Sequence, residues 1–422
     1  MLRRIVLLSS IILLLLCFSF ASACLIANAD TTDDWTMFRH DPRHTGYSTS
    51  PAPVINATLW SYTTGKPVQV SPAVVSGRVY IGSNDKNVYC LDARTGSKIW
   101  NYATGYAISS SPAVVEGQVY IGSSMTLYCL DAGIGNKIWN YTTEGAVGTG
   151  VTSPAVVDGK VYIGSSNSEV YCLNESTGSK IWNYTTGLGI YSSPAVANGR
   201  VYIGSGDKNV YCLDAGTGHK LWNYTTGDEV WSSPAVVDEK VYIGSGDYNV
   251  YCLNASTGTK IWNYATVNYI FSSLAVANGK VYVVTSRDNI IYCLAADTGS
   301  EIWTKTIGIA TIALNAPSPV VADGKVYVGS MDHNVYCLDA SNGSTIWQYA
   351  TGNEIEPSPA VAGTVVYIAS RDGKVYAFGT QYVPEFATMI ASFLTWTILA
   401  VTIIYARKRM ERRAFSKTAV GI

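Results

Sequence analysis

A phrase of about 40 residues recurs along almost the whole chain, and this internal repeat limits the possible folds more than any other feature. One copy, residues 192–227, reads SSPAVANGRVYIGSGDKNVYCLDAGTGHKLWNYTTG. Its tryptophans lie 39 to 44 residues apart, at Trp60, Trp100, Trp139, Trp182, Trp222, Trp262, Trp303 and Trp347. Its opening prolines are Pro72, Pro112, Pro154, Pro194, Pro234, Pro319 and Pro359, with Leu274 in place of one. Both series indicate eight copies.

Each copy reads as four short strands, because segments rich in Val, Ile and Tyr alternate with clusters of Gly, Asp, Asn and Ser. In the fourth copy the expected strands are Pro194–Ala197, Arg200–Gly204, Asn209–Asp214 and Lys220–Tyr224. Forty residues with four antiparallel strands is the size of one propeller blade. The sequence therefore predicts an all-β fold, an eight-bladed β-propeller of four-stranded antiparallel blades.

The two ends of the repeat region favour a closed ring over an open solenoid. The eighth copy stops after its third strand, at 376–378, and the leading segment 57–64 supplies a single fourth strand. Pairing these two would complete the last blade and remove the open sheet edges.

Residues repeated identically in every copy are expected to serve the blade itself. We assign the eight tryptophans, and the tyrosines of the second and third strands, to packing between neighbouring sheets. The repeated glycine before each tryptophan suits a left-handed turn, and the Asp or Asn four residues earlier suits a turn cap rather than a calcium ligand. The cysteines at equivalent places, such as Cys90 and Cys129, are expected to be buried and unpaired. No catalytic residue and no metal site is predicted, since the four histidines show no ligand spacing.

Positions that differ between copies are candidates for binding. Three residues before each opening proline or its replacement, the series reads Gln69, Ser109, Val151, Tyr191, Trp231, Phe271, Ala316 and Glu356. In a closed ring these residues would line the mouth or wall of the central channel, with three aromatic side chains from consecutive copies in one arc. Such a surface suits a peptide, a glycan or a planar ring. The candidate ligand-binding residues are Tyr191, Trp231, Phe271, Gln69 and Glu356, and the alternative is that the rings only plug the channel.

The two ends of the chain read as a signal peptide and a membrane anchor. Two arginines, an apolar stretch and small residues predict a signal peptide at 1–29, with a lipoprotein cleavage before Cys24 as the alternative. Residues 386–406 carry no charge and are long enough to span a bilayer. The basic tail 407–422 that follows is expected in the cytoplasm. Between these ends we expect an N-terminal extension at 30–53, the propeller at 54–380 and a linker at 381–385, all outside the cell.

The charge of the expected outer part argues against nucleic acid as a partner. Without the signal and the tail, 21 Lys and Arg stand against 29 Asp and Glu, and no basic run interrupts them. Phosphate binding requires clustered cations.

The run CLDARTGSKIW at residues 90–100 and its later copies, such as CLDAGTGHKLW, resemble the tryptophan-docking motif of the PQQ-repeat superfamily. Seven whole copies cover roughly residues 54 to 380. That superfamily includes eight-bladed quinoprotein alcohol dehydrogenases and BamB outer-membrane assembly lipoproteins. The segment DWTMFRHDPRHTGYS at 34–48 and VPEF at 383–386 resemble membrane-anchored surface proteins of archaea.

The resemblance leaves three functions to consider. The dehydrogenases have long insertions between blades and an adjacent Cys-Cys pair, whereas this chain has short links and no adjacent cysteines. We therefore expect a non-catalytic binding or scaffolding module at the membrane, with an extracytoplasmic protein or glycan as partner. The alternatives are an oxidoreductase that uses PQQ with calcium, and an envelope assembly factor of the BamB type.

Overall fold

The computed structural model describes residues 33–143, 152–308, 316–379 and 397. The propeller belongs to a unit that ends at Gly379, and of the second unit, Thr380–Ile422, only Thr397 is described. The expected signal peptide, linker and basic tail, and the expected membrane helix apart from Thr397, lie outside the described residues. Within the described part of the chain, no helix has the length and apolar character needed to span a membrane.

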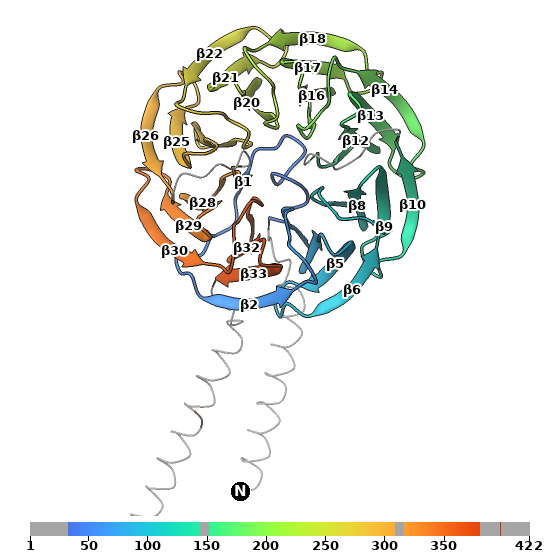
Figure 1. The fold of residues 1–422 in the computed structure, drawn as a ribbon, viewed down its shortest axis with the longest axis vertical. Coiled ribbons are helices and arrows are strands. Elements are labelled where there is room, and N and C mark those ends of the chain that lie inside the picture. Colours follow the sequence, from blue (N-terminus) through green and yellow to red (C-terminus); the bar gives the residue numbers. More distant parts are fainter. Residues whose placement is uncertain (1–32, 144–151, 309–315, 380–396, 398–422) are drawn as a thin grey trace, which may run out of the picture. The chain divides into compact units, whose positions relative to one another are not determined.

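Eight antiparallel four-stranded blades form a ring, as the repeat predicts, and one of them gains a fifth strand from outside the repeat (Figure 1). Within each blade the first strand lies innermost and the fourth outermost, so that a short strand of three residues faces the channel. Blades 1 to 4 consist of β3 (Ala73–Val75), β4 (Arg78–Gly82), β5 (Asn87–Asp92) and β6 (Lys98–Ala103); β7 (Ala113–Val115), β8 (Gln118–Ser123), β9 (Thr126–Asp131) and β10 (Lys137–Thr142); β11 (Ala155–Val157), β12 (Lys160–Gly164), β13 (Glu169–Asn174) and β14 (Lys180–Thr185); β15 (Ala195–Ala197), β16 (Arg200–Gly204), β17 (Asn209–Asp214) and β18 (Lys220–Thr225).

The second half of the ring repeats this order. Blades 5 to 8 consist of β19 (Ala235–Val237), β20 (Lys240–Gly244), β21 (Asn249–Asn254) and β22 (Lys260–Ala265); β23 (Ala275–Ala277), β24 (Lys280–Val284), β25 (Ile290–Ala295) and β26 (Glu301–Thr306); β27 (Val320–Ala322), β28 (Lys325–Gly329), β29 (Asn334–Asp339) and β30 (Thr345–Ala350); β31 (Ala360–Ala362), β32 (Val365–Ala369), β33 (Lys374–Gly379) and β2 (Thr58–Thr63).

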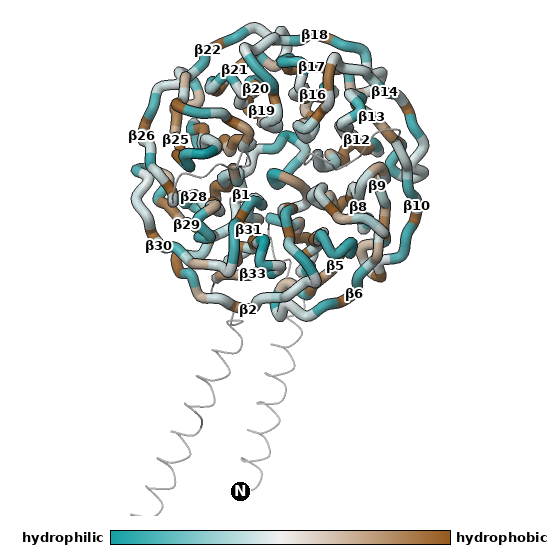
Figure 2. The backbone as a smooth tube through the Cα atoms, in the orientation of Figure 1, coloured by the Kyte–Doolittle hydropathy of each residue, from teal (hydrophilic) through white to brown (hydrophobic). Residues whose placement is uncertain are grey.

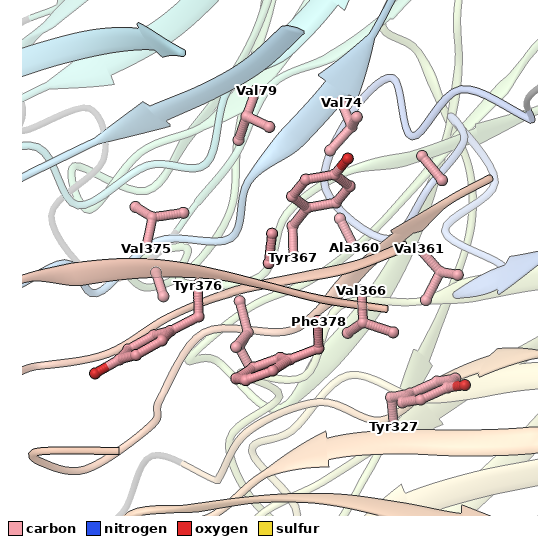
Figure 3. Packing of buried hydrophobic residues seen from close by; sticks show 14 of the residues in the cluster. Val74, Val79, Tyr327, Ala360, Val361, Val366, Tyr367, Val375, Tyr376 and Phe378 are labelled. Carbon is pink, nitrogen blue, oxygen red and sulfur yellow. The ribbon is translucent and has the colours of Figure 1, made fainter. Parts of the chain in front are cut away.

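The ring closes through blade 8, which confirms the predicted use of the leading segment. β2 pairs antiparallel with β33, so the first strand of the repeat region becomes the outer strand of the last blade. Figure 1 shows the blue β2 against the red β33 at the rim. In Figure 3, Tyr367, Tyr376 and Phe378 of this blade lie in one cluster with Val79 of blade 1 and Tyr327 of blade 7. The hydrophobic core is therefore continuous across the closure.

The outermost strands explain why each copy carries one tryptophan. In these strands the tryptophan is turned inward and the residues on either side of it are exposed. Figure 2 shows hydrophilic and hydrophobic residues following one another along the rim. In seven blades the tryptophan Nε1 donates to a backbone carbonyl of the next blade, at 2.9 to 3.3 Å. Trp347 differs, because its neighbour blade 8 takes its outer strand from β2 and has no turn there to offer the carbonyl. Its Nε1 has no hydrogen-bond partner among the described residues.

Except for Trp347, the tryptophan of each outermost strand packs on a glycine in the turn between the third and fourth strands of the next blade. Gly218 has a φ of +74°, and a Cβ at this position would lie 2.6 Å from an atom of the Trp182 ring. The same arrangement joins six further pairs of blades, through Gly96, Gly135, Gly178, Gly258, Gly299 and Gly343. Asp214 caps its turn by accepting hydrogen bonds from the backbone N–H groups of Gly216 and Thr217, as the sequence predicts. The seven described cysteines are buried and unpaired.

The N-terminal extension, from residue 33 to about residue 50, runs along the innermost strands in the channel, which no repeat pattern indicates. Its backbone carbonyls accept hydrogen bonds from the second residue of the innermost strand in six blades, for example Val196 N–H to Pro42 and Val236 N–H to Arg43. Its short strand β1 (Tyr47–Ser48) pairs parallel with β27. Asp33 accepts hydrogen bonds from Ser48 and Thr49, which joins the start of the extension to its end. The inner strand edges, which would otherwise leave N–H groups without acceptors, are paired by this segment.

Candidate functional site

The positions that vary between repeats come together in one cavity at the mouth of the channel. The cavity has a volume of about 90 Å³ and is lined by loops that precede the innermost strands. All five candidate residues line it, and so do Ser109 and Ala316 of the same series. Val151 lies outside the described residues.

One side of the cavity is an aromatic arc made of Tyr191, Trp231 and Phe271, from the loops before blades 4, 5 and 6. The ring centroids of Tyr191 and Trp231 are 5.3 Å apart, and Trp231 stacks on Phe271 at 4.6 Å and 29°. Tyr269 extends the stack, at 5.6 Å from Phe271. The rings lie side by side and are partly exposed, so they present a continuous apolar wall to the cavity.

Trp231 carries an unused donor at this wall. Its Nε1 is buried and finds no acceptor among the described residues. Buried indole N–H groups usually have a hydrogen-bond partner, and leaving one without a partner costs about 1–3 kcal/mol. A ligand that offers an oxygen atom at the arc would remove this cost.

The other side of the cavity is a polar wall formed by Gln69 and Glu356, which are held from outside the lining by Asn84, Glu354 and Arg371 of blades 8 and 1. Both carboxylate oxygens of Glu356 are engaged, one by Gln69 at 2.8 Å and the other by Arg371 at 3.3 Å. Arg371 also contacts Glu354 at 2.6 Å, and Asn84 donates to Gln69. The wall therefore holds two carboxylates against one guanidinium, and its side chains fix one another.

A ring of buried serines lies between these walls and the innermost strands. In seven blades the serine just before the opening position donates its backbone N–H to the serine hydroxyl of the next blade. Seven such bonds, at 2.7 to 3.2 Å, connect Ser71, Ser111, Ser153, Ser193, Ser233, Ser273 and Ser318, and join Ser358 to Ser71. Six of these serines line the cavity. A hydroxyl that accepts one hydrogen bond has a second lone pair and its own proton, so the six serines that line the cavity can contact a ligand.

Phe38 of the extension lines the cavity as well and closes it towards the innermost strands. Its neighbour Arg39 is fully buried in the channel and donates one hydrogen bond, to the Leu274 carbonyl at 2.7 Å. Burial lowers the pKa of the Arg39 guanidinium to about 9, and the attraction of Asp41 opposes this shift. Burial also lowers the pKa of His44 to about 4. The channel is thus blocked by the chain's own residues, and a ligand has access to its mouth.

Sequence reasoning found the arc and part of the polar wall but missed three features. The serine ring has a clear signal, a serine before the opening position in every copy. Arg371 follows a second strand, and Phe38 lies in the extension, so neither belongs to the series of variable positions. In the same loops, Tyr269 stacks on the arc, Glu354 contacts Arg371 behind the polar wall and Tyr106 is outside the cavity lining.

Comparison with protein families gives one match that spans the ring. A family model described as "Outer membrane protein assembly factor BamB" matches residues 54–186, 123–231, 223–304 and 287–381. Together these ranges cover more than three quarters of the chain. The chain belongs to this family. A search of the curated proteins finds no match.

Solved structures of several functions share the fold of this BamB-family propeller. BamB from Moraxella catarrhalis aligns with a TM-score of 0.67 and 20% identity, over 77% of this chain and 100% of that one. Quinohemoprotein alcohol dehydrogenase from Comamonas testosteroni aligns with a TM-score of 0.72 and 16% identity, over 84% and 82%. The computationally designed Ika8 protein aligns with a TM-score of 0.67 and 15% identity, over 78% and 100%. At these identities the likeness shows the fold alone.

The mouth does not fit pyrroloquinoline quinone, the planar tricarboxylate that the dehydrogenase resemblance implies. The cation of the polar wall, Arg371, is already shared by two carboxylates, and Glu356 would repel a further one. A cavity of about 90 Å³ is also small beside the roughly 300–1,000 Å³ of pockets that enclose a ligand. Among the described residues, no group of three or more His, Cys, Asp or Glu side chains is arranged to hold a metal ion.

Proposed function

We propose that this protein is a non-catalytic binding or scaffolding module, with the mouth of the central channel as its binding surface. The helix expected at 386–406 would hold it in a membrane, with the propeller on the extracytoplasmic side. The observation that carries the proposal is the aromatic arc with its unused Trp231 donor, opposite a preformed polar wall. Such a mixture of apolar area and fixed polar groups is typical of recognition sites.

The face around the cavity supports a partner larger than the cavity itself. Large apolar side chains are exposed in the loops of this face, at Tyr106, Met125, Leu188, Tyr248 and Val267. A cavity of this size takes one projecting group, while the surrounding side chains contact the rest of the partner. We therefore favour an extracytoplasmic protein as the partner.

A photo-crosslinking experiment with matched positions tests the binding surface. A benzophenone amino acid replaces Tyr106 at the mouth face or Ile134 in the turn between β9 and β10 on the opposite face. Both native side chains are 66% exposed. In cells that make the full chain, we expect discrete adducts from position 106, none from position 134, and weaker adducts when Trp231→Ala is added. Equal adducts at both positions, or no effect of Trp231→Ala, would contradict the proposal.

A second candidate is an envelope assembly factor of the BamB type, which the family match favours. In that case the crosslinked partner would be an outer-membrane-barrel or secretion component, identified by mass spectrometry of the adduct. An oxidoreductase that uses PQQ is the alternative that the mouth disfavours. Calorimetric titration of the full chain in detergent with PQQ, with and without calcium, should give no saturable heat, and one-to-one binding would revive this alternative.

A further inference from the structure

The loops of the mouth face carry a surplus of negative charge. These loops connect the fourth strand of one blade to the first strand of the next, and the second strand to the third. In their described parts, ten carboxylates stand against five cations, Lys66, Lys86, Lys208, Arg287 and Arg371. The carboxylates are Asp85, Asp207, Asp228, Glu229, Asp247, Asp288, Asp332, Glu354, Glu356 and Asp372.

The opposite face balances its charge. Its turns also carry carboxylates, but lysines or arginines begin most of the second and fourth strands at that end of the blades. These cations are Arg78, Lys160, Arg200, Lys240, Lys280 and Lys325, and Lys98, Lys137, Lys180, Lys220 and Lys260. The surplus negative charge of the ring is therefore concentrated on the mouth face.

Part of this charge is fixed by the blades themselves. Burial raises the pKa of Asp85 and of Asp207, but hydrogen bonds from Tyr89 and Tyr211 and from backbone N–H groups outweigh it and lower both pKa values. The Tyr211 hydroxyl, for example, lies 2.6 Å from Asp207. Both carboxylates are ionised at neutral pH and have no lysine or arginine within ion-pair distance among the described residues.

The cavity inside this field is rich in acceptors and in aromatic surface. Glu356 and the hydroxyls of Ser71 and Ser358 lie on one side, and the aromatic arc lies on the other. A planar cation placed between them would meet aromatic side chains and hydrogen-bond acceptors together. The Trp231 indole N–H needs an acceptor at the same place, and a peptide carbonyl provides one.

We infer that the partner presents an arginine side chain of a peptide segment to the cavity, with the guanidinium against the aromatic arc and its N–H groups towards Glu356 and the serine ring. This inference rests on the proposed function and names its ligand class. The guanidinium offers five donors in one plane and stacks on aromatic rings, which suits this acceptor-lined slot better than the compact ammonium of lysine. The exposed apolar loops contact the residues beside the arginine.

The acid surplus decides against a neutral glycan as the main ligand. A sugar ring also stacks on aromatic side chains and offers hydroxyl oxygens to an indole N–H. It gains nothing, however, from the excess carboxylates of the mouth face. A cationic side chain is attracted by them, and this attraction weakens with salt.

The test compares the pentapeptides acetyl-Leu-Gly-Xaa-Gly-Leu-amide with Xaa as arginine, its neutral isostere citrulline, or glutamate. Binding to the full chain in detergent micelles is followed by calorimetry. We expect the arginine peptide to bind at least about tenfold tighter than the citrulline peptide, and the glutamate peptide not to bind. Raising NaCl from about 50 to about 300 mM should weaken the arginine peptide and leave the citrulline peptide unchanged.

Two variants and a control locate the site. Trp231→Ala and Glu356→Gln should each weaken the arginine peptide at least about fivefold, and Glu356→Gln keeps the test valid if Trp231→Ala fails to fold. Ile134→Ala on the opposite face should have no effect. Arginine and citrulline peptides of equal affinity, or no binding of the arginine peptide at millimolar concentration, would overturn the inference, as would tighter binding of the neutral probe cellotriose. In each of these cases crosslinks at position 106 that depend on Trp231 would leave the proposed function standing.

Discussion

Trp222 and Trp231 are nine residues apart and show two different uses of the same side chain. Trp222 is 9% exposed, lies between blades 4 and 5 and donates to the Ala255 carbonyl at 3.1 Å. Trp231 lies at the channel mouth, stacks on Phe271 and has no acceptor among the described residues. The seam between blades repeats one solution around the ring, whereas the mouth differs from blade to blade. The difference teaches that in this propeller stability and recognition are carried by separate sets of residues.

The largest expected loss of stability is at the contact between two neighbouring blades, which we call the seam, here between blades 4 and 5. Trp222→Ala removes a buried ring, its hydrogen bond and its packing against Gly258, and should lower the free energy of unfolding by about 3–5 kcal/mol. The measurement is denaturant unfolding of the full chain in detergent, followed by circular dichroism. Binding at the mouth should survive in the fraction that is folded. A loss below about 1 kcal/mol would break the separation between seam and mouth.

The second prediction asks whether the channel also carries stability. Burial holds the pKa of His44 at about 4, and the unfolded chain has the ordinary value of about 6.5. Because the unfolded state binds more protons between these values, stability should fall as pH falls from about 6.5 to about 4, by up to about 3 kcal/mol. Unfolding measured across this range checks it, and His44→Gln should flatten the profile. A profile that His44→Gln leaves unchanged would show that the extension does not hold this imidazole neutral.

Two glycines of blade 4 isolate the contact at the seam. Gly218 and Gly199 both have positive φ, at +74° and +69°, but a Cβ meets the Trp182 ring at Gly218 and nothing within 4 Å at Gly199. Alanine at either position pays the same backbone strain of about 1–2 kcal/mol. Gly218→Ala should therefore cost about 1–3 kcal/mol more than Gly199→Ala, measured by thermal unfolding. Equal costs would mean that the tryptophan moves aside freely.

The smallest stability effect is expected at the mouth. Trp231→Ala removes a partly exposed ring and its stacking on Phe271, so the free energy of unfolding should fall by only about 1 kcal/mol. The measurement is the same unfolding experiment as for Trp222→Ala, which serves as its matched comparison. A loss as large as that of Trp222→Ala would favour a plug over a binding surface.

The strands of the blades could be predicted in detail because the same strand pattern occurs in each of the eight copies. Of the four strands expected in the fourth copy, Arg200–Gly204 and Asn209–Asp214 agree with β16 and β17, and the other two differ by one residue at one end. The arc could be predicted because closing the ring places equivalent positions side by side. The same reasoning applied to the serine before each opening position would have given the serine ring.

The extension and part of the polar wall could not be predicted in this way. Residues 33–50 have no counterpart in the repeat, and their hydrogen bonds reach residues up to 313 positions away along the sequence, so no local pattern indicates them. Arg371 approaches Glu356 from a turn between strands, and only the packed loops determine that contact. Contacts of the extension with the blades, and contacts between loops, therefore have to be taken from the three-dimensional structure.

The path of the extension has a consequence for the order in which the protein assembles. Residues 33–50 leave the ribosome before any blade, yet their partners in blades 7 and 8, such as Val321 and Gly363, are made near the end. Early blades must form with unpaired inner strand edges, and the extension settles only when the ring is almost complete. Contacts of such long sequence separation form slowly. A segment that is translated before every blade is therefore expected to reach its native place last, together with the strand β2 that follows it.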